Sequence, residues 1–535
     1  MVHFIGAGAI GAGGDVRVAQ AEAPDFEKVN WKKEPHLRKL YALCAVLMIA
    51  SATTGYDGTL LNVSQQINAW DSFFRPEIGS RHLLGIMVNM FNIGSIISFL
   101  LTPYLADNFG RKTAIIIGCS FMIVGGLLTA FAKNYNMYIS GRIIIGFGNS
   151  FAQMCAPMLL TEICHPQHRG PVTAIYNCLW NVGAFFVVCI GWGTSSVQSE
   201  WAWRSVTLFQ VVPSIIQLSF IWFVPESPRY LISKDRNEEA LEILAEYHGG
   251  GDENNATVQF EYQEITQTIN LEKSLGTQSS YLDFVRTGGN RWRLAIIVSL
   301  GIISQYSGNA IFSNYLNAVL IGAGITDQNQ KLGISTGKIL LDCIVTITAA
   351  TQVDRVGRRP LFLTAIFGMV GSCVCWTLTA AIFEKSASQN VTAGYAQLIF
   401  IFLFGVFYDI GFSGLLVSYA LEVLPFKLRA KGMMIMNITI QATLALSNQT
   451  NMIAWDNLPD HWNFILFYTV WDFIELIFVY FVYVETKGPT LEEIARIFDG
   501  DDAIAHVDLR QVEKEVSVGI THRDRATYYP KKHAF

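Results

Sequence analysis

The stretch LYALCAVLMIASATTGYDG, residues 40–58, contains no charged side chain until Asp57, its next-to-last residue. A run of about 20 mostly apolar residues is the length that an α-helix needs to cross the hydrocarbon core of a bilayer. A carboxylate within such a run costs roughly 2.5–3.5 kcal/mol on insertion scales and points to a functional role. The stretch therefore predicts a membrane-spanning helix and raises the question of what Asp57 does there.

The composition of the whole chain agrees with a membrane protein. Charged residues make up 15% of the 535 residues, while the residue types AVILMFWYC make up 51%; soluble domains carry about 25% charged residues. The net charge of −5 and the lack of a Lys/Arg-rich run give no indication of a nucleic-acid partner. The nine cysteines are scattered, mostly within apolar runs, which argues against a disulfide framework. We expect no metal and no cofactor.

Apolar stretches long enough to cross a bilayer recur along the chain, and we count twelve. They lie near residues 40–62, 83–106, 113–132, 137–160, 172–193, 205–224, 294–322, 333–352, 360–383, 394–421, 433–455 and 462–484. Because no water is present to satisfy the backbone in the hydrocarbon, each stretch must form a helix. The sequence therefore predicts an all-α membrane protein with twelve transmembrane helices in two six-helix bundles.

A polar segment, residues 229–291, separates the first six predicted spans from the last six. Short loops on its side of the membrane carry nine basic residues, against six on the other side, so both termini and this segment should be cytoplasmic. The predicted parts are a flexible N-terminal tail, a first bundle, a central loop with short helices, a second bundle and a C-terminal tail, at residues 1–36, 37–228, 229–291, 292–485 and 486–535.

The two predicted bundles also repeat each other. LADNFGRK (105–112) recurs as QVDRVGRR (352–359), EICHPQHRG (162–170) as EVLPFKLRAKG (422–432), and PESPR (225–229) as VETKG (484–488). The order of the three motifs and their side of the membrane are the same in both halves. A repeat of this kind is typical of transporters built from related halves.

With these motifs the sequence resembles the sugar porter family of the major facilitator superfamily, over about residues 36–498. Its further signatures are GYDG (55–58), GRIIIGFG (141–148), QYSGN (305–309) and ETKGPTLEEI (485–494). GYDGTLLN and QYSGN look most like the fungal branch that contains lactose and cellodextrin permeases. The resemblance implies two bundles around a central sugar site that opens to either side in turn. Asn108, Val484, Ser304 and Ala310 depart from the family pattern, and the last two weaken the case for plain glucose.

The acids and bases of the repeated motifs are predicted to bridge neighbouring helices and to latch a cytoplasmic gate. The alternative is that the basic residues merely follow the positive-inside rule, but that rule does not require the paired acids. The predicted gating residues are Asp107, Arg111, Glu162, Arg169, Glu226, Arg229, Asp354, Arg358, Glu422, Arg429 and Glu485.

Uncharged amides at helical spacing are the candidate sugar contacts. In the eleventh span four amides, Asn437, Gln441, Asn448 and Asn451, share a face roughly 80° wide. Amides offer donors and an acceptor to hydroxyls, although they also hold helices together in membranes. The predicted sugar contacts are Gln153, Asn177, Trp180, Asn181, Gln305, Asn309, Asn437, Gln441 and Asn448. We also expect Gly308 to break the seventh helix.

Asp57 and Arg142 are the candidate proton-coupling pair. Arg142 has no counterpart in the second half, where Phe402 takes its place, and it shares a helix stripe with Asn149 and Gln153. The resemblance maps Asp57 onto the acid that proton-coupled sugar porters keep. Other acids compete for the role: Asp342 should pair with Lys338, four residues earlier, whereas Asp409, Asp472 and Glu475 have no local partner.

The sequence thus predicts a monomeric plasma-membrane transporter, not an enzyme, that imports a sugar together with a proton. Its partners are a sugar, a proton and the bilayer; the sugar is a disaccharide such as lactose or cellobiose, or a hexose. An uncoupled sugar facilitator and a non-transporting sugar sensor stay open, although the C-terminal tail is short for a sensor. Asn390 is the one N-glycosylation site expected in an outer loop.

Overall fold

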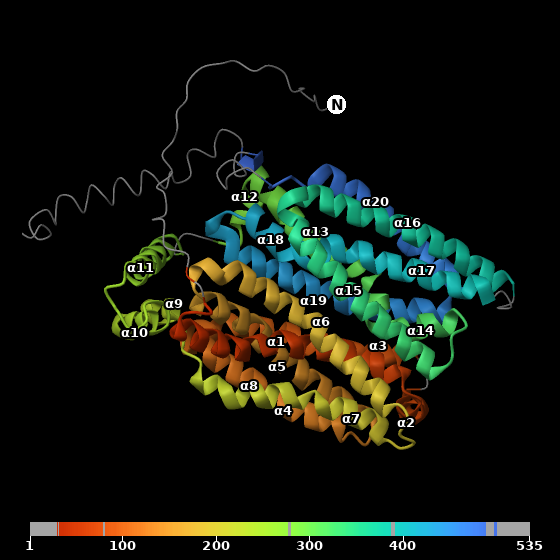
Figure 1. Cartoon of the computed structure of the whole chain (residues 1–535). Helices are drawn as coiled ribbons and strands as arrows, with labels where there is room; N and C mark the ends of the chain where they lie inside the picture. Colours follow the sequence, from red (N-terminus) through yellow and green to blue (C-terminus); the bar gives the residue numbers. More distant parts are fainter. Residues whose placement is uncertain are drawn as a thin grey trace, which may run out of the picture.

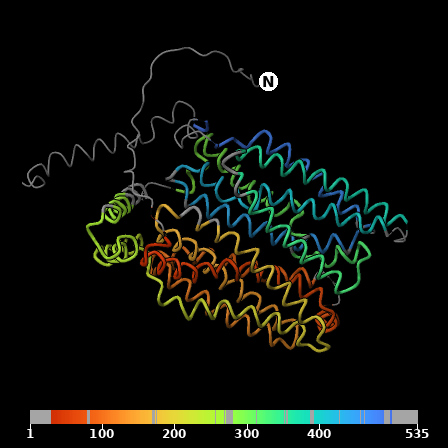
Figure 2. The backbone as a smooth tube through the Cα atoms, viewed as in Figure 1, coloured from red at the N-terminus to blue at the C-terminus, as the bar shows by residue number. Residues whose placement is uncertain are grey.

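The computed structural model describes residue 29 and residues 31–78, 81–276, 280–386, 391–458, 460–487 and 497–499. Most of the predicted terminal tails, together with Asn390, lie outside these residues. Within them the chain folds into helices that form two bundles lying side by side, red to yellow and green to blue in Figure 1. The backbone trace in Figure 2 shows the same division of the chain.

Helices α1 to α8 build the first bundle (Figure 1). Their bounds are α1 Pro35–Gln66, α2 Asn68–Ile78, α3 Arg81–Phe109, α4 Arg111–Ala130, α5 Tyr135–Ile163, α6 Arg169–Thr194, α7 Trp201–Phe209 and α8 Val211–Phe220. Helix α2 is a short helix after the first span, and α7 and α8 together form one span. Short 3₁₀ turns follow α5 and α8, at Pro166–His168 and Ile221–Phe223.

Four helices, α9 to α12, lie between the two bundles in the chain and at one end of them (Figure 1). They are α9 Pro228–Ser233, α10 Asn237–His248, α11 Ala256–Gly276 and α12 Asp283–Arg286. His248 of α10 joins this segment to the first bundle, because its ring contacts the carboxylate of Glu261 in α11 and lies 3.1 Å from the Ile163 carbonyl oxygen. We call the end of the molecule that carries these helices the loop end, and the other the far end.

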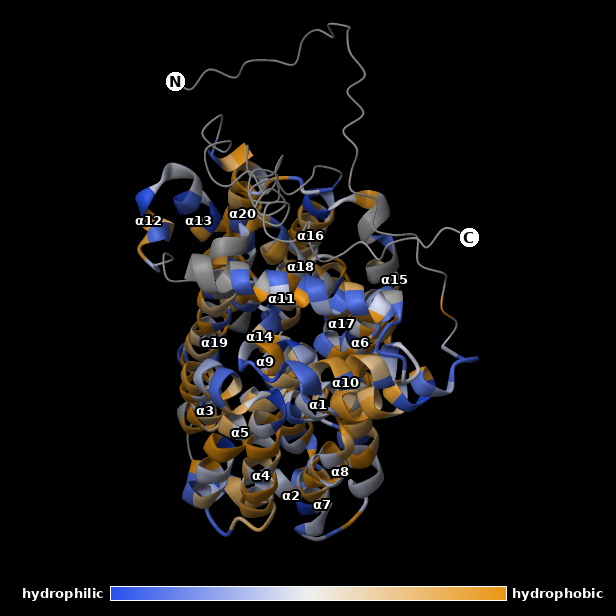
Figure 3. Cartoon of the chain, turned by 90° about the vertical axis from the view of Figure 1, so that its left-hand side faces the viewer, coloured by the Kyte–Doolittle hydropathy of each residue, from blue (hydrophilic) through white to orange (hydrophobic). Residues whose placement is uncertain are grey.

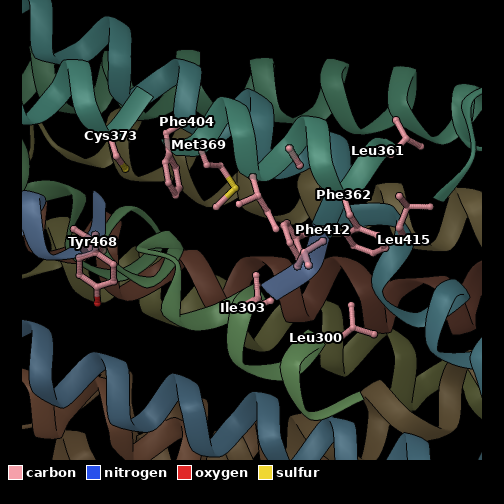
Figure 4. Close-up of a cluster of buried hydrophobic side chains, with 14 of the residues drawn as sticks. Leu300, Ile303, Leu361, Phe362, Met369, Cys373, Phe404, Phe412, Leu415 and Tyr468 are labelled. Atoms are coloured by element: carbon pink, nitrogen blue, oxygen red, sulfur yellow. The ribbon is translucent and has the colours of Figure 1, made fainter. Parts of the chain in front are cut away.

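The second bundle contains the remaining helices. Their bounds are α13 Gly288–Tyr306, α14 Asn309–Gly322, α15 Gln328–Val356, α16 Arg358–Lys385, α17 Val391–Tyr408, the π-helical segment η3 Asp409–Ser413, α18 Gly414–Val423, α19 Phe426–Asn457 and α20 His461–Val482. Its core includes aromatic side chains from different helices. Figure 4 shows Phe412 of η3 against Phe362 of α16, with ring centroids 5.3 Å apart.

Among the described residues, 11 helices are long and apolar enough to cross a membrane. They match the predicted spans except for the eleventh, which is α19. This helix has 32 residues, long enough to span a bilayer, but the amides of its polar stripe lower its hydropathy. Figure 3 shows hydrophobic residues along the helices of both bundles and hydrophilic ones gathered at their ends. The predicted all-α membrane fold is confirmed.

Hydrogen bonds join the two bundles near the far end. Gln66 and Ser335, both buried, donate to each other's side chains, at 2.9 and 3.1 Å. The Asn317 side chain donates to the Gln65 carbonyl at 2.8 Å, and that of Asn89 to the Ala445 carbonyl at 2.9 Å. We call these contacts the far-end seam. They hold α1 and α3 of the first bundle against α14, α15 and α19 of the second.

Candidate functional site

Asp57 lies within α1 and is completely buried. Neither of its carboxylate oxygens has a hydrogen-bond partner in the described part of the chain. Its charged neighbour is Arg142 of α5, which is 4% exposed and near enough for an electrostatic attraction. The guanidinium of Arg142 also lies over the ring of Phe91, 5.1 Å from its centroid. The two groups therefore attract each other electrostatically without a hydrogen bond to the Asp57 carboxylate.

The side chains around this pair continue the polar stripe of α5. Thr54 of α1 donates a hydrogen bond to the side-chain oxygen Oδ1 of Asn149 at 3.0 Å, and Asn149 is 1% exposed. Gln153, one turn further along α5, is exposed. The stripe predicted from the spacing of Arg142, Asn149 and Gln153 thus runs from the buried charge pair to an accessible amide.

Helix α6 carries three of the predicted sugar contacts. Asn177 and Trp180 are exposed, and Asn181 is buried. The indole of Trp180 lies over α1, where a Cβ added at Gly58 would be 3.6 Å from it. The backbones of the two helices approach closely at Gly55, whose added Cβ would lie only 1.9 Å from the Trp180 carbonyl oxygen. Trp180 thus lies next to the turn of α1 that carries Asp57.

The seventh span is interrupted at Gly308, as predicted. Gly308 has φ +92°, which ends α13 and begins α14. Gln305 and Asn309 flank the break and are both half-buried. Tyr408 of α17 donates to the carbonyl oxygen of Ser304 at 2.8 Å and hydrogen-bonds the side chain of Asn309. The break therefore places two predicted sugar contacts beside the start of η3.

The amides of α19 divide into two groups along the helix. Asn437 and Gln441 are half-buried, and the Gln441 side-chain oxygen has no partner among the described residues. Asn448 is completely buried and accepts a hydrogen bond from Asn314 of α14 at 3.0 Å. Asn451 accepts one from Tyr468 of α20. In this conformation the amides nearer the far end hold helices together, which is the alternative that the sequence left open.

Each bundle has an ion pair between two of the repeated motifs at its loop end. Arg111 Nε lies 3.2 Å from Glu162 Oε2 in the first bundle, and Arg358 Nη2 lies 2.9 Å from Glu422 Oε1 in the second. The repeat seen in the sequence is therefore a repeat of geometry. Each pair joins helices of one bundle, α4 to α5 or α16 to α18.

The third motif of each half also lies at the loop end, where its glutamate contacts the helix that the first motif begins. The Glu226 carboxylate accepts the backbone N–H of Lys112, at 3.2 Å from Oε2, and burial raises the pKa of Glu226. Glu485 accepts the N–H groups of Arg358 and Arg359 at 3.0 and 3.1 Å. A carboxylate at a helix N-terminus satisfies free N–H groups and interacts favourably with the helix dipole. These carboxylates therefore fix the first turns of α4 and α16.

For the other predicted gating residues the structure gives fewer contacts. Asp107 is exposed near the end of α3, 3.6 Å from Arg111 at the start of α4. Arg229 lies in α9 and Arg429 near the start of α19. The side chains of Arg169 and Asp354 lie outside the part of the chain that the structure describes.

Comparison with known proteins decides the family. A family model described as "Sugar (and other) transporter" matches residues 43–498. The chain belongs to this sugar transporter family. It is 28% identical over 491 residues to the high-affinity glucose transporter of Kluyveromyces lactis, covering 88% of this chain and 87% of that protein. It is also 28% identical over 481 residues to the hexose transporter HXT9 of Saccharomyces cerevisiae, covering 84% and 81%.

Solved structures agree on the fold of this sugar transporter. The inward-open xylose transporter XylE of E. coli superposes with a TM-score of 0.71 at 20% identity, over 86% of this chain and 100% of that one. The proton:xylose symporter XylE bound to 6-bromo-6-deoxy-D-glucose gives 0.69 at 21% identity, over 86% and 99%. The resemblance read from the motifs is confirmed, and so is the prediction of a transporter rather than an enzyme.

In the structure, a third ionisable residue, which the sequence analysis did not connect to them, lies near Lys338 and Asp342. Lys338 and Asp342 form the predicted ion pair, with 2.6 Å between Nζ and Oδ2. Asp409, for which the sequence offered no partner, lies against this pair. No periodicity could have shown this contact, because Asp409 lies in η3, on a different span from α15. The π-helical turn has no sequence signal beyond the glycines at 411 and 414.

Proposed function

We propose that this transporter imports a sugar by proton symport, with Asp57 and Arg142 as the coupling pair. The observation that carries the proposal is the complete burial of Asp57 without a hydrogen-bond partner among the described residues. An ionised carboxylate in a bilayer is stable only beside a compensating charge. A carboxylate that can either hold a proton or face an arginine fits a site that loads and unloads a proton.

The helix turn that carries Asp57 also contacts candidate sugar-binding side chains, which would couple protonation to sugar binding. Thr54 and Gly58 lie on the same helix as Asp57, and they contact Asn149 of α5 and Trp180 of α6. A movement of α1 on protonation therefore changes the position of an amide stripe and an aromatic ring. An aromatic ring can cover the apolar face of a sugar, while amides bind its hydroxyls. Both candidate binding surfaces lie within reach of the charge pair.

We propose that the sugar binds between the two bundles. The first bundle would supply Gln153, Asn177 and Trp180, which are accessible. The second would supply Gln305, Asn309 and Gln441, which are half-buried at the break of the seventh span and on α19. Asn181, Asn437 and Asn448 complete the proposed set. The K. lactis relative is named as a glucose transporter and XylE as a xylose symporter, which supports a hexose, a pentose or a disaccharide of such units as substrate.

Alternating access follows from the two kinds of contact at the two ends. The far-end seam joins the bundles to each other, whereas the loop-end ion pairs of Arg111 and Arg358 join helices within one bundle. We infer that the seam closes the outer side in this conformation and that the loop end is cytoplasmic, with both termini inside. The protein would act as a monomer in the plasma membrane.

The test is accumulation of a non-metabolised sugar analogue in cells that lack their own sugar transporters. The wild type should concentrate the analogue more strongly as external pH falls, and a protonophore should abolish this. Asp57→Asn, which mimics the protonated acid, should still exchange sugar across the membrane but should not concentrate it. Glu238→Gln, which removes an exposed acid of α10 outside every proposed site, is the control and should accumulate normally.

Each alternative function gives its own result. Uptake that never exceeds the external concentration in the wild type indicates an uncoupled facilitator. Absence of any uptake, with the protein at the cell surface and sugar still bound, indicates a sensor. Accumulation by Asp57→Asn as high as in the wild type would remove Asp57 from the coupling site.

A further inference from the structure

A second group of ionisable side chains lies inside the second bundle, and we call it the C-bundle triad: Lys338 and Asp342 of α15 and Asp409 of η3. Lys338 Nζ lies 2.6 Å from Asp342 Oδ2, and each of these side chains is 17% exposed. Asp409 is 8% exposed, and its Oδ2 has no hydrogen-bond partner among the described residues. Gly405 of α17 leaves room for the group, because an added Cβ would lie 3.3 Å from Asp342 Oδ1.

The triad contains one more acid than base. Lys338 is already paired with Asp342, so a second ionised acid would leave an uncompensated negative charge at membrane depth. Asp409 lies near enough to both Lys338 and Asp342 for electrostatic interaction. Two carboxylates beside one ammonium do not both stay ionised in a buried site, because like charges disfavour each other there. The arrangement of the triad therefore calls for one bound proton in this conformation.

The neighbour of Asp409 in the chain touches the proposed sugar site. Tyr408 donates to the Ser304 carbonyl at 2.8 Å and hydrogen-bonds Asn309, on the two sides of the break in the seventh span. Asp409 begins the π-helical turn Asp409–Ser413, and single π-turns inside α-helices occur often at functional sites. A change in the charge of Asp409 can therefore move Tyr408 and, with it, Gln305 and Asn309.

We propose that the C-bundle triad is a second proton-binding site, and that Asp409 releases its proton and regains it in each transport cycle. This inference rests on the proposed proton-coupled sugar transport and adds a second proton to it. Asp409 in the acid form carries no charge and leaves the Lys338 ammonium to Asp342. When the proton leaves, the carboxylate of Asp409 competes with that of Asp342 for the Lys338 ammonium, and Tyr408 shifts with the turn. No other reactant is needed.

The surroundings of Asp409 limit what else could balance its charge. Lys338 and Asp342 face it from α15, and the Tyr408 hydroxyl lies beside it on α17. Cys343 of α15 is a further titratable neighbour of Asp342. The hydroxyl oxygens of Thr346 in α15 and Ser413 in η3 lie 3.5 Å apart. This further contact between the two helices is thus made by neutral groups. Lys338 is thus the cation that the two acids share.

The experiment measures the ratio of protons to sugar in liposomes that contain the purified full-length protein. The ratio is obtained from the electrical and pH gradients that just balance a fixed sugar gradient. Asp409→Asn should lower the ratio by one proton per sugar and still transport sugar, whereas Asp409→Glu should restore the ratio. Asp472→Asn, which removes another buried acid, on α20, is the control and should leave the ratio unchanged.

Infrared difference spectra of the wild type, with and without sugar, provide a second readout that does not need transport by the variant. Sugar should change a carboxylic-acid band in the wild type, and this change should be lost in Tyr408→Phe, which keeps Asp409 but removes its link to the break. An unchanged proton ratio in Asp409→Asn, or an equal fall in Asp472→Asn, would overturn the inference. So would an unaltered infrared change in Tyr408→Phe.

The two proposals fail in different ways. If Asp57→Asn abolishes coupling and Asp409→Asn has the wild-type ratio, the triad is not a coupling site and the proposed function stands. If the wild type ignores the proton gradient altogether, the proposed function fails. The infrared experiment then decides separately whether a carboxylic acid linked to Tyr408 responds to sugar.

Discussion

Glu485 Oε1 accepts the backbone N–H of Arg358 at 3.0 Å, at the first residue of α16. In the first bundle Glu226 makes the same kind of contact with the N–H of Lys112, in the first turn of α4. The residue before each helix is a glycine at positive φ, Gly357 at +107° and Gly110 at +93°. The third sequence motif of each half thus serves to fix the helix that the first motif begins.

The first prediction concerns this helix start. In Gly357→Ala the new Cβ would lie 2.8 Å from Glu485 Oε2, at a backbone conformation that alanine rarely adopts. We expect a loss of about 1–3 kcal/mol in the free energy of unfolding, seen as a lower melting temperature of the purified protein. Gly371→Ala in the same helix meets nothing within 4 Å and should not lower it. An equal fall in both variants would mean that the contact with Glu485 has no special role.

The second prediction concerns the approach of α1 to α6. A Cβ at Gly55 would lie 1.9 Å from the Trp180 carbonyl oxygen, so Gly55→Ala must push the helices apart. Small residues permit such close packing in membranes. We expect transport to fall strongly, because Asp57 and Trp180 are displaced together. Gly193 of α6 has open space around it, so Gly193→Ala should transport normally. Normal uptake by Gly55→Ala would show that this packing can relax without harm.

The sequence predicted contacts within one helix better than contacts between helices. The spacing of Lys338 and Asp342 indicated their ion pair, and Gly308 indicated the break of the seventh span. Both depend only on local geometry, which repeats every 3.6 residues. The same spacing put Asn437 and Asn448 on one face of α19. It could not show that Asn448 would accept a hydrogen bond from Asn314 of α14.

The repeated motifs were visible for a different reason. The two halves repeat, so the sequence predicted the same acids and bases in both, but the structure shows that Glu162 pairs with Arg111 and Glu422 with Arg358. Asp409 has no such counterpart, and its neighbours come from another span. Tertiary contacts of an unrepeated side chain depend on how helices are rotated against each other, and a single sequence does not specify that rotation.

The third prediction tests charge balance at the coupling pair. Arg142→Gln would leave Asp57 with no compensating charge, and removal of one member of a buried pair costs about 3–5 kcal/mol. We expect little protein at the cell surface. The double variant Asp57→Asn with Arg142→Gln has no buried charge and should recover surface expression while remaining unable to accumulate sugar. Surface labelling gives the comparison; if the double variant is no better expressed than Arg142→Gln, the two charges do not compensate each other.

The fourth prediction concerns the far-end seam. Gln66→Ala removes the reciprocal hydrogen bonds with Ser335 between the bundles, each with a net contribution of about 1 kcal/mol. The state that is closed at this end should become less populated. A cysteine introduced at Asn314, which lies on α14 beside the seam, should then react faster with a maleimide that cannot cross the membrane. Ser195→Ala, which removes a hydrogen bond to the Trp192 carbonyl three residues earlier in the chain, is the control and should not change the rate. Equal rates in Gln66→Ala and the parent would exclude the seam as a closure.

The last prediction tests the proposed sugar site. Asn177, Gln305 and Gln441 come from three helices of the two bundles, and their side chains are exposed or half-buried. Alanine at each position removes one or two hydroxyl contacts of about 1 kcal/mol net, so the apparent KM should rise about fivefold to thirtyfold. Asn457→Ala is the control, because this exposed amide at the end of α19 donates to the Ile453 carbonyl of its own helix. Uptake is measured at several sugar concentrations, with surface expression measured in parallel. A wild-type KM in all three variants would place the sugar elsewhere. A change confined to the maximal rate would assign these amides to the movement of the helices instead.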